Sequence, residues 1–176
     1  MSTSTSPGPG STPAFNRHPA ASPVRPARLT VARILISVVA LVTAVSPALA
    51  DYNETHIFNP RWPPHAKFHD AMTIQLGVLL GVLALVLVWY RRRSPSPGRV
   101  YAAAVVASLY WLSLVGANFF PNTSYVDPEF AADLPLVAGV LPPQVVLAVI
   151  LLVLLVIASL LSRPRPRTLP GVRRRD

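Results

Sequence analysis

Cysteine is absent from the 176-residue chain, which excludes disulfides, thiol nucleophiles, zinc–thiolate sites and thiolate-ligated clusters. Charge is also scarce, because Asp, Glu, Lys and Arg make up 13% of the residues, against about a quarter in average soluble domains. Acidic residues are the rarer kind, with seven against sixteen basic ones. Hydrophobic residues reach 52%. This composition excludes an ordinary soluble domain and predicts the lipid bilayer as the protein's solvent and partner.

Long stretches without charge divide the chain into four candidate membrane spans. Residues 34–50, 71–90, 100–120 and 134–162 carry no charged side chain, and about twenty helical residues cross the roughly 30 Å hydrocarbon core. Pro142 and Pro143 divide the last stretch, so its span begins near Gln144. Helices are expected because an open strand would leave backbone amides unpaired in lipid. The sequence predicts an all-α, four-helix membrane bundle with spans at about residues 30–50, 71–90, 100–120 and 144–162.

The distribution of charge predicts how the bundle is oriented. Fourteen of the sixteen cations lie in residues 1–33, 91–99 and 163–175, whereas the connections 51–70 and 121–143 hold two cations and six of the seven acids. By the positive-inside rule both termini are cytoplasmic, and these two connections lie outside a cell membrane that the chain crosses several times. A net charge of +9 would suggest nucleic acid for a soluble protein, but its placement here indicates membrane topology and no nucleic-acid partner.

Both ends of the chain are expected to lie outside the bundle. Residues 1–27 are rich in Ser, Thr, Pro and Gly and predict a disordered cytoplasmic arm ahead of the membrane domain, residues 28–162. Residues 163–176 form a basic cytoplasmic tail that suits anionic lipid headgroups. The first span also matches a signal peptide with a cleavage site before Asp51. Its long Pro-rich leader and near-full length favour retention, and cleavage would leave three spans in the same orientation.

A polar segment, residues 56–70 with the sequence HIFNPRWPPHAKFHD, lies between the first two spans and holds three of the four histidines. Proline is tolerated in the first turn of a helix, so Pro63 and Pro64 suit a helix start, and His65 and His69 then share one helix face. Asp70, which follows His69, and His56, in the preceding loop, can join them. This predicts a site for a divalent transition metal, formed by His56, His65, His69 and Asp70.

Two other interpretations of this segment stay open. Its histidines also suit an acid and a base in catalysis near neutral pH. Alternatively, the segment is a polar collar at the membrane interface, with Phe58 and Trp62 at headgroup depth and the charged side chains solvated beside them. The collar is the simpler interpretation, because histidines four residues apart are common by chance and no HExxH motif is present.

Small residues mark two helix faces that suit close packing. Gly77 and Gly81 form a GxxxG pattern, and a stripe of small residues follows in the third span. Such faces serve packing inside the bundle, and they equally allow a homo- or hetero-oligomer. Polar side chains in the spans are expected to hydrogen-bond between helices or to point into a cavity. The stripe comprises Ala103, Ala104, Ala107 and Ser108, and the polar side chains are Gln75, Tyr110, Ser113 and Asn118.

The second outer connection, residues 121–143, combines three acids with a hydrophobic end. The hydrophobic end is expected to lie on the membrane or to dip into it. The carboxylates of this connection can approach the histidine segment, at a distance that the sequence does not define.

The segment HIFNPRWPPHAKFHD resembles a signature, HxxNPxWPPHxxFH, that precedes the second helix in a group of small, functionally uncharacterised four-helix membrane proteins. The resemblance covers about residues 30–162 and implies an integral membrane bundle, with no particular reaction. Membrane desaturases and hydroxylases also use HxxxH boxes, but they need several boxes on the cytoplasmic side, whereas this chain has one on the predicted outer side. The signature residues are His56, Asn59, Pro60, Trp62, Pro63, Pro64, His65 and His69.

The sequence favours a multi-pass membrane protein of structural or interaction type and unassigned activity, with the histidine segment as its functional surface. One alternative is a metal-dependent membrane enzyme, an oxidoreductase or hydrolase that acts on a lipid-like substrate through the four predicted metal ligands. Another is a binder or carrier of small apolar molecules, with Gln75 and Asn118 as polar contacts. The absence of charged or histidine side chains deep in the spans argues against ion-coupled transport.

Overall fold

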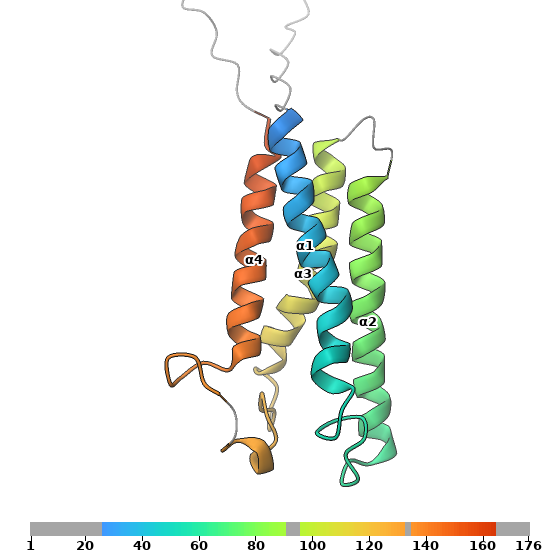
Figure 1. Ribbon diagram of the computed structural model, residues 1–176, viewed down its shortest axis with the longest axis vertical. Coiled ribbons are helices and arrows are strands. Elements are labelled where there is room, and N and C mark those ends of the chain that lie inside the picture. Colours follow the sequence, from blue (N-terminus) through green and yellow to red (C-terminus); the bar gives the residue numbers. More distant parts are fainter. Residues whose placement is uncertain (1–25, 91–95, 133–134, 165–176) are drawn as a thin grey trace, which may run out of the picture.

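Four long helices stand side by side in an antiparallel bundle (Figure 1). The structure, a computed structural model, describes residues 26–90, 96–132 and 135–164, so most of the predicted arm and tail lies outside the described residues. The helices are α1 (Pro26–Asp51), α2 (Pro64–Trp89), α3 (Pro97–Ala117) and α4 (Pro143–Leu161), and a short 3-10 helix, η1 (Pro128–Phe130), precedes α4. Each of these four α-helices has the length and the apolar composition needed to cross a membrane. The prediction of an all-helical protein with four such helices is confirmed.

The two ends of the described chain lie at the same end of the bundle (Figure 1). The first connection, residues 52–63, and the described parts of the second, residues 118–132 and 135–142, lie at the opposite end, which we call the loop end. Figure 1 shows that α1 and α2 extend further toward the loop end than α4 does. The polar segment and the second connection are therefore brought to one end of the molecule.

Proline begins each long helix. Its ring fixes φ near the helical value, and its missing N–H belongs to a turn whose donors have no intrahelical partner. Accordingly, α2 begins at Pro64 directly after Pro63, and α4 begins at Pro143 directly after Pro142. Because of Pro64, α2 starts ahead of the predicted span 71–90 and includes a polar first part.

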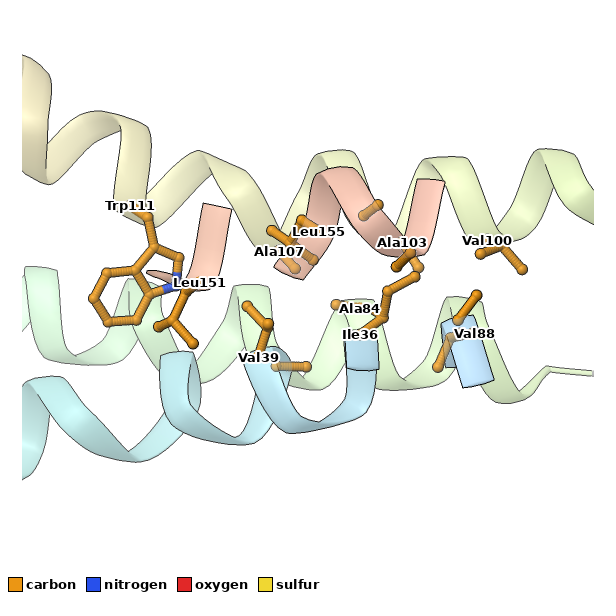
Figure 2. Close-up of a cluster of buried hydrophobic side chains, with 14 of the residues drawn as sticks. Ile36, Val39, Ala84, Val88, Val100, Ala103, Ala107, Trp111, Leu151 and Leu155 are labelled. Carbon is orange, nitrogen blue, oxygen red and sulfur yellow. The ribbon is translucent and has the colours of Figure 1, made fainter. Parts of the chain in front are cut away.

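The core lies along the contacts that α1 makes with each of the other three helices. Among the described residues, α2 and α4 do not contact each other, so they lie on opposite sides of α1 and α3. Most side chains in the centre are small and aliphatic (Figure 2). The largest fully buried side chain is the aromatic Trp111. Exposed valine and leucine side chains cover the outer faces, as lipid contact requires. The labelled core residues are Ile36, Val39, Ala84, Val88, Val100, Ala103, Ala107, Trp111, Leu151 and Leu155.

Two glycines allow α2 to approach α1 closely. A methyl group at Gly77 would lie 2.8 Å from Cγ of Pro47, and one at Gly81 would overlap the carbonyl oxygen of Ala40 and lie 2.8 Å from Cβ of Ala44. The GxxxG face therefore packs inside the bundle, and the alanines of the small-residue stripe are also buried. An oligomer through such faces stays a prediction.

Candidate functional site

The first connection, residues 52–63, folds into consecutive turns at the loop end. Asn53 organises the first of them, because its Oδ1 accepts hydrogen bonds from the backbone N–H of Thr55 at 2.8 Å and from the Thr55 hydroxyl at 2.6 Å. Pro60 and Pro63 cannot donate backbone hydrogen bonds, so the segment does not continue as a helix until Pro64 begins α2.

Asn59 lies at the centre of a contact between the two connections, and its side chain is almost fully buried. Its Oδ1 accepts a hydrogen bond from the backbone N–H of Arg61 at 2.9 Å. Its Nδ2 donates to the carbonyl oxygen of Thr55 at 3.2 Å and to Oε1 of Glu129 at 3.3 Å. One amide therefore fixes its own turn and binds a residue 70 positions further along the chain.

Two further interactions complete this contact between the two connections. The guanidinium of Arg61 forms an ion pair with the carboxylate of Glu129, and the indole N–H of Trp62 donates to Oδ2 of Asp127 at 3.0 Å. The acids lie on or beside η1. We call Asn59, Arg61, Trp62, Asp127 and Glu129 the loop clasp. It confirms that carboxylates of the second connection approach the histidine segment, and it gives a structural role to Asn59 and Trp62, two residues of the predicted signature.

His65 and His69 lie one turn apart on an exposed face of α2. Their Nε2 atoms are 3.0 Å apart, and their ring planes meet at 82°. Phe68 lies beside both, with its ring stacked on His65 at 6.2 Å between centroids and edge-on to His69 at 5.6 Å. The start of α2 at Pro64 thus produces the predicted shared histidine face. We call His65, Phe68 and His69 the aromatic triplet.

His56 has different neighbours. Its Nε2 lies 3.7 Å from Oδ1 of Asp51, and its Nδ1 lies 2.7 Å from the hydroxyl oxygen of Thr55. Its ring packs edge-on to Trp62, with 5.0 Å between the centroids. Asp70 interacts electrostatically with His56 and with Asp51. One oxygen of Asp70, Oδ2, is buried without a hydrogen-bond partner among the described residues.

The four predicted metal ligands therefore fall into two groups. His65 and His69 pair with each other, whereas His56 faces Asp51 and interacts electrostatically with Asp70. In the described part of the chain, no three His, Asp or Glu side chains gather in a way that could hold a metal ion. A site that uses all four residues stays a prediction. Asp51 is not among the predicted site residues, and its signal in the sequence is its position where the first apolar run ends.

The predicted polar contacts of a bundle cavity are not found inside the bundle. Gln75 and Asn118 are both exposed, so the expectation that they line a cavity is wrong. Gln144, at the start of α4, binds the second connection instead, because its Nε2 donates to the carbonyl oxygen of Tyr125 at 2.8 Å. In the described parts of the chain, these two side chains thus give no support to a carrier of small apolar molecules.

The four apolar helices define a multi-pass membrane protein of unassigned activity. Residues 35–173 match the sequence model of a family of unknown function, DUF6640, and the chain belongs to this family. No curated protein and no solved structure matches the chain. The expected membership of an uncharacterised family is thereby confirmed.

Proposed function

We propose that the protein is a structural or interaction-type protein of the cell membrane, which presents the aromatic triplet to a protein partner. The observation that carries the proposal is the loop clasp, which ties the residues just before α2 to η1 through Asn59, Arg61 and Trp62. Phe68 is 62% exposed beside two exposed imidazoles. Aromatic side chains on a backbone that is already fixed in position lose little conformational entropy when a partner binds.

The proposed orientation places both termini in the cytoplasm and the loop end outside the cell. It is supported by the fourteen cations of residues 1–33, 91–99 and 163–175. The described residues next to these segments, at the start of α1, the end of α2, the start of α3 and the end of α4, lie at the end of the bundle opposite the loop end. In this orientation the basic tail faces the anionic headgroups of the inner leaflet.

Site-specific photo-crosslinking in intact cells tests the interaction proposal. A photoreactive amino acid at Phe68 is expected to give one discrete protein adduct. The same amino acid at Leu79, which is 64% exposed on α2 deeper in the span, is expected to give none. The Asn59→Ala variant should weaken the Phe68 adduct, because it removes the centre of the loop clasp. Equal adducts from both positions, or no protein adduct at Phe68, would contradict the proposal.

A second candidate function is metal-dependent chemistry on a lipid-like substrate, and the His65–His69 pair favours it. Two bonds of about 2.0–2.1 Å from imidazole nitrogens to one metal ion, meeting near a right angle, place the nitrogens about 3 Å apart. The observed Nε2 to Nε2 distance of 3.0 Å matches this requirement. Both histidines are exposed, so a divalent transition metal bound there would keep open positions for water or a substrate.

Metal analysis of the detergent-purified protein after supplementation with Zn²⁺ or Cu²⁺ tests this candidate. The double variant His65→Ala, His69→Ala should lose the ion, and His56→Ala should retain it because His56 faces Asp51. Loss in both variants would favour the site of His56, His65, His69 and Asp70 over the pair. Wild-type protein without bound metal would refute both versions.

A further inference from the structure

The end of the second connection forms a small hairpin just before α4. The backbone N–H of Val137 donates to the carbonyl oxygen of Leu141 at 2.8 Å, and the N–H of Leu141 donates back to Val137 at 3.1 Å. The N–H groups of Gly139 and Val140 also find acceptors within the hairpin, at 3.4 and 3.2 Å. Ala138 and Gly139 make the turn with φ angles of 52° and 71°. We call residues 136–141 the apolar hairpin.

Every large side chain of the apolar hairpin is hydrophobic and exposed. Val140 at the turn is 75% exposed, and the others are 44–47% exposed. The sequence carries no charge from residue 134 to residue 162, so the apolar hairpin and α4 form one continuous uncharged stretch. In water such a surface would be unfavourable, and its continuity with a membrane-crossing helix indicates what covers it.

The length of α4 sets the depth of the apolar hairpin. Its 19 residues span about 28 Å at about 1.5 Å per residue, close to the roughly 30 Å of the hydrocarbon core. All of α4 is therefore needed to cross the core, and the hairpin that precedes it lies at the boundary between acyl chains and headgroups. Figure 1 shows the hairpin projecting sideways at the level of this end of α4, whereas η1 and the connection 52–63 lie further out.

We propose that the apolar hairpin inserts into the adjacent lipid leaflet, with Val140 among the upper acyl chains. Lipid is the occupant that the structure favours, because backbone at this depth must be satisfied internally and the hairpin bonds four of its own N–H groups, those of Val137, Gly139, Val140 and Leu141. The proposal needs only that α4 crosses the membrane, so it stands whichever side of the membrane holds the loop end and whether or not the aromatic triplet binds a partner.

Fluorescence quenching in phosphatidylcholine vesicles tests the insertion. The chain has no cysteine, so Val140→Cys and Leu136→Cys each provide one unique site for an environment-sensitive label on the full-length protein. Ser124→Cys is the matched control, because Ser124 is exposed in the same connection but polar. Val153→Cys, on an exposed face of α4, reports the signal of a lipid-facing position.

The labels at residues 140 and 136 should emit at shorter wavelength than the label at residue 124. They should be quenched by nitroxide-bearing lipid, as at residue 153, and protected from aqueous iodide. Labels at both hairpin positions that are quenched by iodide as strongly as the residue 124 label would overturn the proposal. Protection from iodide without quenching by lipid, together with disulfide-linked dimers of Val140→Cys, would also overturn it and assign the surface to a second copy of the chain.

Discussion

At the scale of single residues, one buried hydrogen bond joins the helices α1 and α3. The indole N–H of Trp111 donates to the hydroxyl oxygen of Thr43 at 2.8 Å, and this hydroxyl donates to the carbonyl oxygen of Val39 at 2.8 Å. Trp111 and Thr43 are both fully buried. The tryptophan thus fills the core without leaving its N–H unpaired, which low dielectric would make costly.

We expect Thr43→Val to destabilise the bundle, because it keeps the shape of the side chain and removes the acceptor of Trp111. The free energy of unfolding should fall by about 1–2 kcal/mol. Unfolding of the detergent-solubilised protein by SDS measures it. Thr73→Val is the control, since Thr73 is exposed and should change stability little. If Thr43→Val combined with Trp111→Phe is destabilised by the full sum of the single changes, the hydrogen bond does not provide the stability.

Gly81→Ala tests the close approach of α1 and α2. The added methyl would overlap the carbonyl oxygen of Ala40, which is backbone and cannot move aside alone. Overpacking of this kind should reduce the free energy of unfolding by about 1–3 kcal/mol. Gly116→Ala in α3 is the matched control, because its methyl would meet no described atom within 4 Å and alanine favours helix by up to about 1 kcal/mol. Equal stability of the two variants would show that α2 does not depend on this contact.

At the scale of elements, the helices could be predicted from local signals and the contacts between connections could not. Charge-free runs indicated the four spans, and Pro63–Pro64 indicated a helix start that places His65 and His69 on one face. The pairing of Asn59 with Glu129 joins residues 70 positions apart, and no local pattern defines such a distance. The four predicted metal ligands fall into two groups for the same reason, because His56 turns toward the end of α1.

Arg33, at the end of the bundle opposite the loop end, also makes contacts that could not be predicted from the sequence. Charge counting treats it as a cytoplasmic cation, but its side chain is only 8% exposed. Its Nε donates to the carbonyl oxygen of Val88 at 3.1 Å, and its guanidinium lies 4.0 Å from the centre of the Trp89 ring. A cation near the C-terminus of α2 interacts favourably with the helix dipole. Arg33 therefore connects α1 to α2 in addition to contributing to the predicted orientation.

We expect Asn59→Ala to loosen both connections at once, because the amide contacts both. The loss of hydrogen bonds worth about 1–2 kcal/mol in total should speed local amide hydrogen exchange by about five- to thirty-fold. Exchange should rise in residues 52–63 and in residues 127–130. Asn53→Ala is the control, since its contacts lie within the first connection and at the end of α1. A change confined to residues 52–63 in both variants would mean that the loop clasp does not couple the two connections.

At the scale of the whole molecule, α1 is an integral part of the bundle. It contacts each of the other helices and contributes Ile36 and Val39 to the core. Cleavage before Asp51 would remove α1 and expose the glycine face of α2. We therefore expect the first span to be retained. The intact mass of the purified protein should be close to the 19.0 kDa of the full chain, and a species that begins at Asp51 would contradict this.

The orientation of the bundle can be determined because the chain has no cysteine of its own. Gly98→Cys places a thiol next to the arginine-rich connection, at an exposed position where no described atom lies within 4 Å of the added carbon. Ser124→Cys places one at the exposed loop end. Moving the arginines of residues 91–99 across the membrane would be opposed by the positive-inside rule, so the Gly98 side should face the cytoplasm.

A membrane-impermeant maleimide added to intact cells should therefore label Ser124→Cys and should label Gly98→Cys only after permeabilisation. Wild-type protein, which has no thiol, gives the background for both. The reverse pattern would place the loop end in the cytoplasm, and the aromatic triplet would then be presented to cytoplasmic partners. Labelling of both variants in intact cells would mean that the placement of fourteen of the sixteen cations on one side of the membrane domain does not fix a single orientation.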